Sequence, residues 1–193
     1  MNTTKEYSRP VWRATAVHVV IPAGLTILLF LCANLYIIVP SYRANLMRLK
    51  KESIQELTNT IWVLLEHYDQ RVESGELTLA ESQRRAIERI RALRYGPEGK
   101  DYFWINDTSP RMIMHPYRPD MEGKDLSHYT DPDGKRLFQE FVKVVEEKGS
   151  GYIGYLWQWK DRPSHVVPKL SYVREFEPWG WIIGTGIYLD DVQ

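Results

Sequence analysis

The sequence predicts an α+β fold in which a five-stranded antiparallel sheet follows a long helix, with one transmembrane helix before both. Residues 149–188 contain three strand-like runs that are rich in aromatic and β-branched residues and are separated by turn residues. Apolar side chains recur near the 3.6-residue period of a helix over residues 41–74. Residues 14–39 contain no Asp, Glu, Lys or Arg.

Length and composition limit the classes of protein that this chain can represent. At 193 residues, one globular domain with accessory segments is expected, and the chain is long enough to bury a core. A formal net charge of zero gives no indication of a nucleic-acid partner. The single cysteine, Cys32, excludes a disulfide within the chain and lies in the most apolar segment, where an activated thiolate is not expected.

The uncharged run over residues 14–39 predicts a membrane-spanning helix, because it exceeds the roughly 20 apolar residues that cross a bilayer. The alternative is a cleaved signal peptide. Such peptides have shorter apolar cores of about 7–15 residues and end in a small-x-small site, whereas this run ends in bulky residues. The basic residues before the run are Lys5, Arg9 and Arg13. They favour a cytoplasmic N-terminus over residues 1–13, and hence a single-pass protein of the inner membrane with its sheet domain periplasmic.

Two helices are expected over residues 40–99, between the membrane and the sheet. The first covers residues 41–74, and Gly75 suits its left-handed C-terminal cap. The second begins with the capping-box pattern Thr78-Leu-Ala-Glu81 and runs to about Leu93. Two interpretations of the first helix stay open, a stalk packed on the sheet or a stalk that also forms a homodimer, because its apolar stripe is not a strict heptad.

The sheet itself is expected over residues 100–190. An amphipathic helix over residues 137–148 is predicted between the second and third strands, with its apolar face inward. The five predicted strands cover residues 101–106, 111–116, 151–159, 166–173 and 178–188. The turn Asp131-Pro-Asp-Gly134 resembles the start of a calcium loop but lacks the later acidic ligands, so a plain turn is favoured.

Taken together, the chain resembles a single Cache domain, the extracellular PAS-like sensor module of bacterial chemoreceptors and sensor kinases, over residues 40–190. The matching segments are, in order, Asp101–Asp107, Met114–Pro116, Glu122–Leu126, Asp131–Gly134, Gly151–Trp159, Pro168–Tyr172 and Pro178–Tyr188. The resemblance implies a pocket for a small organic acid, often of two or three carbons, and a role in chemotaxis or two-component signal transduction. It implies neither a cofactor nor a catalytic site.

Members of that family usually continue into a second membrane span and a cytoplasmic output module, whereas this sequence stops at Gln193. The difference leaves three alternatives open. We expect a truncated receptor, a protein that signals through a partner, or a membrane-anchored binding or interaction subunit without its own output.

Candidate ligand contacts come from polar and aromatic residues on the predicted strands. A buried carboxylate needs a cation or several hydrogen-bond donors, and Lys169 in its apolar run is the first candidate, with His115 at the end of the second strand. Ser171 shares the face of Lys169, whereas Tyr172 lies opposite it unless a bulge turns one of them. The complete candidate set is His115, Lys169, Ser171, Tyr172, Trp157, Trp159, Tyr155 and Trp104.

Each candidate also has a structural interpretation. Lys169 would serve equally as a charge that protects an edge strand from aggregation. His115 would serve equally as a structural hydrogen-bonding group. His115, Asp120, Asp125 and His128 form no standard metal-site spacing, so no metal is expected. An extracytoplasmic enzyme is the least favoured class, because His-Glu-x-x-His, Gly-x-Ser-x-Gly and glycine-rich phosphate-loop motifs are absent from the sequence.

Overall fold

The computed structural model describes residues 19–189. The predicted cytoplasmic N-terminus, residues 1–13, and the first part of the predicted span, residues 14–18, lie outside the described residues. The chain divides into two compact units, residues 1–46 and 47–193, and each is described by itself.

The described part of the first unit is helical. α2 (Ile21–Ala33) leads into one π-helical segment, η2 (Asn34–Ile38), and then into α3 (Val39–Glu73), which continues into the second unit. Pro22 lies in the first turn of α2, where a missing backbone N–H is tolerated. The helix that begins at Ile21 is long and apolar enough to cross a membrane, although a signal sequence near an N-terminus meets the same criteria.

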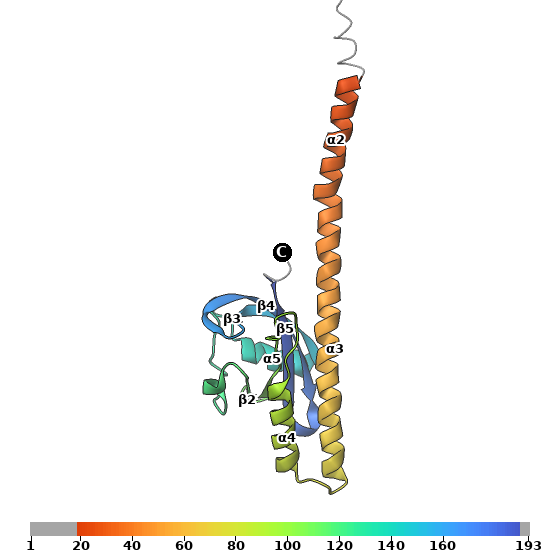
Figure 1. Cartoon of the computed structure of the whole chain (residues 1–193). Coiled ribbons are helices and arrows are strands. Elements are labelled where there is room, and N and C mark those ends of the chain that lie inside the picture. Colours follow the sequence, from red (N-terminus) through yellow and green to blue (C-terminus); the bar gives the residue numbers. More distant parts are fainter. Residues whose placement is uncertain (1–18, 190–193) are drawn as a thin grey trace, which may run out of the picture. The chain divides into compact units, whose positions relative to one another are not determined.

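The second unit is a five-stranded antiparallel sheet with helices on both faces (Figure 1), which confirms the predicted α+β fold. The strands lie side by side in the order β2-β1-β5-β4-β3. One face is covered by α3 and α4 (Leu79–Ala92), and the other by α5 (Leu137–Lys148) and the loop before it. The strands are β1 (Trp104–Asp107), β2 (Met112–Met114), β3 (Ser150–Trp159), β4 (Arg162–Phe176) and β5 (Trp181–Tyr188).

Alternation along the strands sends side chains into two separate cores. Ile105 and Ile183 belong to the core beneath α3 and α4, whereas Trp104 and Ile182 belong to the core beneath α5. Since a fully buried aliphatic or aromatic side chain contributes about 1.5–3 kcal/mol, both layers are held to the sheet mainly by burial.

Hydrogen bonds add to the packing between α3 and the strands beneath it. The Trp62 indole donates to the carbonyl oxygen of Glu175 in β4 at 2.9 Å. The Tyr152 hydroxyl, on β3, donates to the carbonyl oxygen of Lys51 at 3.0 Å. The long helix is therefore attached to two different strands within the second unit.

The predicted helix ends are largely confirmed. Gly75 has φ +75°, the left-handed conformation expected after α3. The Thr78 hydroxyl accepts a hydrogen bond from the Glu81 backbone N–H at 3.2 Å and caps α4. The Glu81 carboxylate, however, pairs with Arg84 and Arg85, so the side-chain half of the capping box is replaced by ion pairs.

Three strands start three or four residues away from their predicted positions, and the other two start one residue away. The first strand begins at Trp104, because Asp101 pairs with Tyr95 in an isolated bridge before the sheet. The fourth begins at Arg162, because the β3–β4 hairpin turns already at Lys160, where φ is +43°. The fifth begins at Trp181, because a 3₁₀ turn occupies residues 177–179. Pattern alone does not place such starts, since turn geometry decides them.

β3 is the outer strand on its side of the sheet, and side chains from the preceding loop occupy its outer edge. The Asp131 carboxylate accepts the Leu156 backbone N–H at 3.0 Å, and the Lys135 ammonium donates to the Gly154 carbonyl oxygen at 2.6 Å. Asp131 also begins the predicted turn, in which the Gly134 N–H donates to its carbonyl oxygen at 2.9 Å.

Candidate ligand-binding site

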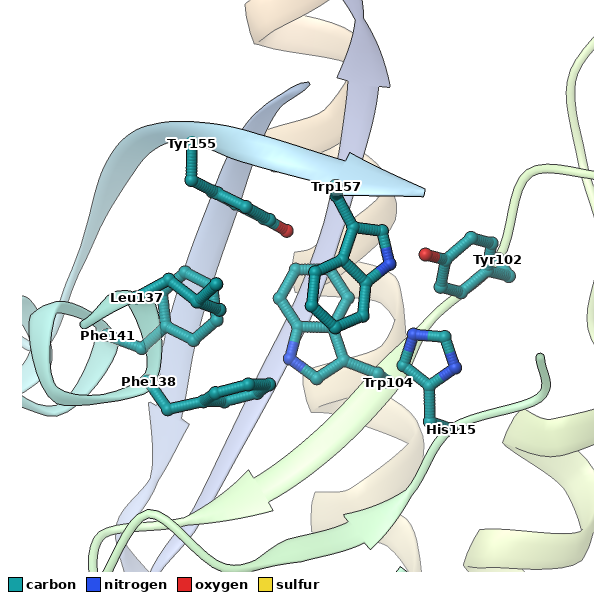
Figure 2. Close-up of a pocket in the computed structure, with 8 residues that line it drawn as sticks. All are labelled: Tyr102, Trp104, His115, Leu137, Phe138, Phe141, Tyr155 and Trp157. Carbon is teal, nitrogen blue, oxygen red and sulfur yellow. The ribbon is translucent and has the colours of Figure 1, made fainter. Parts of the chain in front are cut away.

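A small cavity lies between the sheet and α5 (Figure 2). It offers about 10 Å³ to the centre of a water-sized molecule, which is the space for about one water. An acid of two or three carbons is larger, so its binding requires lining side chains to move apart. The lining residues are Tyr102, Trp104, His115, Leu137, Phe138, Phe141, Tyr155 and Trp157.

Two glycines of β5 leave room for the side chains around this cavity. A Cβ atom at Gly184 would lie 2.2 Å from the Trp104 ring. A Cβ atom at Gly186 would lie 2.3 Å from Ser171 Oγ and 3.0 Å from Lys169 Cε. The Gly-Thr-Gly sequence therefore serves close packing within a strand, where glycine allows a neighbouring group to approach.

Lys169 is buried directly behind the cavity. Its side chain belongs to β4, an interior strand of the sheet, and only 1% of the residue is exposed. Its ammonium donates to the Tyr102 hydroxyl at 2.9 Å and lies 4.2 Å from the centre of the Tyr102 ring and 5.2 Å from that of Trp104. Within residues 19–189, no carboxylate forms an ion pair with it. Burial lowers the pKa of Lys169 to about 7, and the Asp101 carboxylate opposes this shift.

Tyr102 connects this lysine to the cavity. Burial raises the pKa of the Tyr102 hydroxyl well above its ordinary value, so the phenol stays protonated. Its oxygen accepts from Lys169, and its own proton interacts with the Tyr188 hydroxyl, which partly offsets the burial that raises the pKa of Tyr188. Figure 2 shows that hydroxyl and the indole nitrogen of Trp157 pointing toward one another. The Trp157 Nε1 atom is buried and has no hydrogen-bond partner among the described residues.

His115 adds a third donor beside these two. Burial, followed by the positive charge of Lys169, lowers the pKa of His115 well below its ordinary value, so the imidazole is neutral at neutral pH. Its Nδ1 atom accepts the Tyr117 backbone N–H at 3.2 Å, which leaves the proton on Nε2. The ring centre lies 4.9 Å from that of Tyr102 and 5.7 Å from that of Trp157.

The opposite wall of the cavity is largely apolar. Phe138 and Phe141 project from α5, and the Tyr155 ring packs against Phe141 with centres 5.4 Å apart. The Tyr155 hydroxyl is hydrogen-bonded to Ser171 Oγ at 2.9 Å. The cavity therefore has hydrogen-bond donors at one end and hydrocarbon at the other.

Comparison with known proteins decides the family. The model of the family described as single Cache domain 2 matches residues 46–193. This chain belongs to the single Cache domain 2 family. The resemblance inferred from the strand motifs is thereby confirmed.

Full-length relatives of this Cache domain are signalling proteins. The methyl-accepting chemotaxis protein McpP of Pseudomonas putida is 38% identical over 197 residues, which cover 100% of this chain and 34% of that protein. The sensor histidine kinase MctS of Rhizobium johnstonii is 32% identical over 155 residues, which cover 80% of this chain and 32% of that protein. The chain thus spans about a third of the length of these curated relatives.

Two solved structures are similar to this Cache domain. The periplasmic sensor domain of a chemotaxis protein has a TM-score of 0.71 and 45% identity, covering 75% of this chain and 98% of that one. A Cache chemosensory domain, described as showing the structural basis of carboxylic acid recognition, has a TM-score of 0.72 and 41% identity, covering 76% of this chain and 98% of that one. Cache domains are sensor modules that are not themselves catalytic.

The structure brings six of the eight predicted contacts of this Cache domain to one place. Trp104, His115, Tyr155 and Trp157 line the cavity, and Lys169 and Ser171 lie against its lining residues. The interpretation of Lys169 as an edge charge is wrong, because β4 has neighbours on both sides.

Tyr172 and Trp159 lie elsewhere in the Cache domain. No bulge interrupts β4 near Tyr172, so the residue stays on the face opposite Lys169, and its hydroxyl donates to Ser150 Oγ at 2.9 Å. Trp159 follows the one irregularity in the β3–β4 pairing, after Gln158, and packs on Tyr188 with ring centres 4.7 Å apart.

Sequence reasoning missed Tyr102 and the wall formed by α5. Tyr102 precedes Trp104 by two residues, so strand alternation carried a usable signal. Phe138 and Phe141 were predicted to face inward, and they do, but periodicity does not distinguish a core position from a cavity wall.

Proposed function

We propose that this Cache domain is an extracytoplasmic sensor that binds a small organic acid of two or three carbons, for chemotaxis or two-component signal transduction. One observation carries the proposal. The buried Lys169 ammonium has no ion pair among the described residues, and it donates to Tyr102, whose hydroxyl and the indole nitrogen of Trp157 point toward one another. Burial of a cation is unfavourable unless it is paired, and a ligand carboxylate would supply the missing charge.

In the proposed complex the carboxylate lies between Tyr102, Trp157 and His115. Each contributes one hydrogen: the phenol O–H, the indole Nε1–H and the imidazole Nε2–H. Lys169 supplies the positive charge, through its hydrogen bond to the Tyr102 oxygen or by direct contact once the aromatic rings move apart. The short tail of the acid rests against Phe138 and Phe141.

The proposal also concerns the position of the domain in the cell. The apolar helix at the N-terminus anchors the chain in the inner membrane, and the Cache domain lies in the periplasm. The length and composition of that helix support the anchor, and the similar periplasmic domain supports the location.

The proposal also includes a homodimer in which two copies pair along α3. Sedimentation of the full chain in detergent tests this pairing. A monomer at all concentrations contradicts it.

Ligand binding tests the central part of the proposal. The full chain in detergent is titrated by calorimetry and by thermal shift with acetate, propionate, lactate and pyruvate. An acid at 100 times its dissociation constant stabilises the folded state by about 2.7 kcal/mol. Acetamide, which has the shape of acetate without its charge, is the matched control and should bind at least ten times more weakly. Flat melting curves and no heat with all four acids contradict the proposal.

A further inference from the structure

A second hollow of the Cache domain adjoins the cavity and opens to the surface. It is a cleft of about 270 Å³ between the loop that precedes α5 and the outer strand β3. Its lining includes Arg118, Tyr129, Asp131 and Trp157. Trp157 therefore lines both the buried cavity and the open cleft.

Aromatic side chains that line the two spaces pack against one another. The Trp157 ring centre lies 5.8 Å from that of Tyr129 and 6.1 Å from that of Phe138, and Tyr129 lies 5.6 Å from Phe138. Buried side chains also change rotamer without any change of fold. Rotation of Trp157 or Tyr129 would therefore join the cleft to the cavity, which must widen in any case to hold an acid.

The cleft carries a positive charge close to the cavity. The Arg118 backbone N–H donates to the His115 carbonyl oxygen at 3.3 Å, so the two residues share one turn of the loop. Arg118 lines the cleft, and its guanidinium makes two hydrogen bonds of 2.8 Å with Asp120, whose side chain is 57% exposed and is not part of the cleft lining.

The acidic residue in the cleft lining, Asp131, keeps its negative charge, but its oxygens bind backbone N–H groups rather than Arg118. Both Asp131 carboxylate oxygens accept backbone N–H groups, one from Leu156 and the other from Asp133 and Lys135. The Arg118–Asp120 pair is partly exposed, and such pairs contribute little to stability. Arg118 can therefore exchange the Asp120 carboxylate for that of an arriving acid without loss of the fold.

We propose that the organic acid enters through this cleft, and that Arg118 is a positioning residue that draws the carboxylate to the Trp157 side chain. The inference rests on the proposed function and names its entry route. A charge at the mouth of a low-dielectric cleft concentrates ions of the opposite sign and raises the association rate.

Exchange kinetics of ¹³C-labelled acetate, measured by NMR on the full chain in detergent, test the role of Arg118. Arg118→Gln lowers the association rate constant about twofold to tenfold and leaves the dissociation rate constant nearly unchanged. Asp120→Asn raises the association rate, because it removes the competing carboxylate. Arg89→Gln, an exposed arginine of α4, removes the same charge elsewhere and is the matched control. These differences shrink as salt rises, since exposed charges are screened.

A reversible plug tests the route itself. Thr130 is exposed at the cleft, and Thr130→Cys in a Cys32→Ser background is modified with a bulky thiosulfonate reagent. Modification slows acetate exchange at least tenfold, and a reductant restores it. Ser109→Cys, exposed in the turn between β1 and β2, receives the same reagent as the control and leaves the exchange unchanged.

The outcomes separate this inference from the function on which it rests. Absence of acetate binding, and of binding of the other three acids, by the unmodified chain contradicts the proposed function. Normal binding with unchanged exchange in the plugged protein overturns the entry route. If Arg118→Gln and Asp120→Asn both slow association and both lower the melting temperature, the pair is only structural, and the role of Arg118 is overturned.

Discussion

Replacing Lys169 by methionine removes the charge behind the cavity and keeps the bulk of the side-chain stem. Two opposite effects are expected, one on binding and one on stability. A charge-assisted hydrogen bond contributes about 1.5–3 kcal/mol, so the affinity for the acid should fall about tenfold to a hundredfold or more. Calorimetry with the best acid on both proteins measures this change.

The free protein should be no less stable after the substitution. The Lys169 pKa lies near 10.5 in the unfolded chain and at about 7 in the folded one, and at about 1.4 kcal/mol per pKa unit the difference amounts to roughly 5 kcal/mol as an upper limit. The lost hydrogen bond to Tyr102 offsets about 1 kcal/mol of this gain. Denaturant unfolding at pH 7 without acid should therefore show Lys169→Met at or above the native stability.

A second buried lysine provides the matched control. Lys160 is also 1% exposed, but its ammonium lies 3.5 Å from a Glu98 oxygen and 3.8 Å from an Asp101 oxygen. Lys160→Met removes a buried cation from beside Glu98 and Asp101, so it should lower stability and change the affinity little.

Unchanged affinity in Lys169→Met would refute the reasoning and move the anion site to His115 and the indole donor of Trp157. A lower affinity together with a less stable free protein would indicate a packing defect, and would equally remove the support for a charge interaction.

Four further predictions concern the pH dependence of stability and of binding, a glycine of β5, and the isolated second unit. Between pH 7 and about 10 the folded chain has released the Lys169 proton and the unfolded chain has not, so the unfolding free energy should rise by up to about 1.4 kcal/mol per pH unit in denaturant titrations, and level off below pH 7. Acid binding needs the protonated amine, so the affinity should fall up to about tenfold per pH unit above pH 7. Calorimetry in buffers of different ionisation heat should then show proton uptake on binding. An affinity that stays constant from pH 6 to 9 argues against a role of the Lys169 charge. Gly184→Ala forces a methyl group against the Trp104 ring, so it should lower stability by about 1–3 kcal/mol and weaken acid binding. Gly154→Ala is the control: its methyl group meets no atom within 4 Å, so stability and binding should stay unchanged. Residues 47–193 expressed alone should fold and bind the acid like the full chain, since both cores lie within them; an unfolded product by circular dichroism would disprove this.

The fold was predictable because its signals are local. Apolar periodicity predicted α5 at its observed bounds, and aromatic and β-branched runs separated by turn residues predicted the five strands. The order of the strands was not predictable from these runs, because it depends on pairing between distant segments. That order decides whether Lys169 lies at an edge or in the interior.

The site was predictable in part. Alternation placed Lys169 and Ser171 together and set Tyr172 apart, as observed. Trp159 was grouped with Trp157 because alternation gives no sign of the bulge between them. The contribution of Tyr102 depends on a hydrogen bond from a residue 67 positions later, and no local pattern encodes such a contact.

The side chains along the edge of β3 have a consequence for crowding. An outer strand normally offers unpaired N–H and C=O groups on which a second chain can add a strand, and this is a common beginning of aggregation. Here the Asp131 carboxylate already occupies the Leu156 N–H, and the Lys135 ammonium occupies the Gly154 carbonyl. Two copies brought side by side at high density therefore find this stretch of strand already paired.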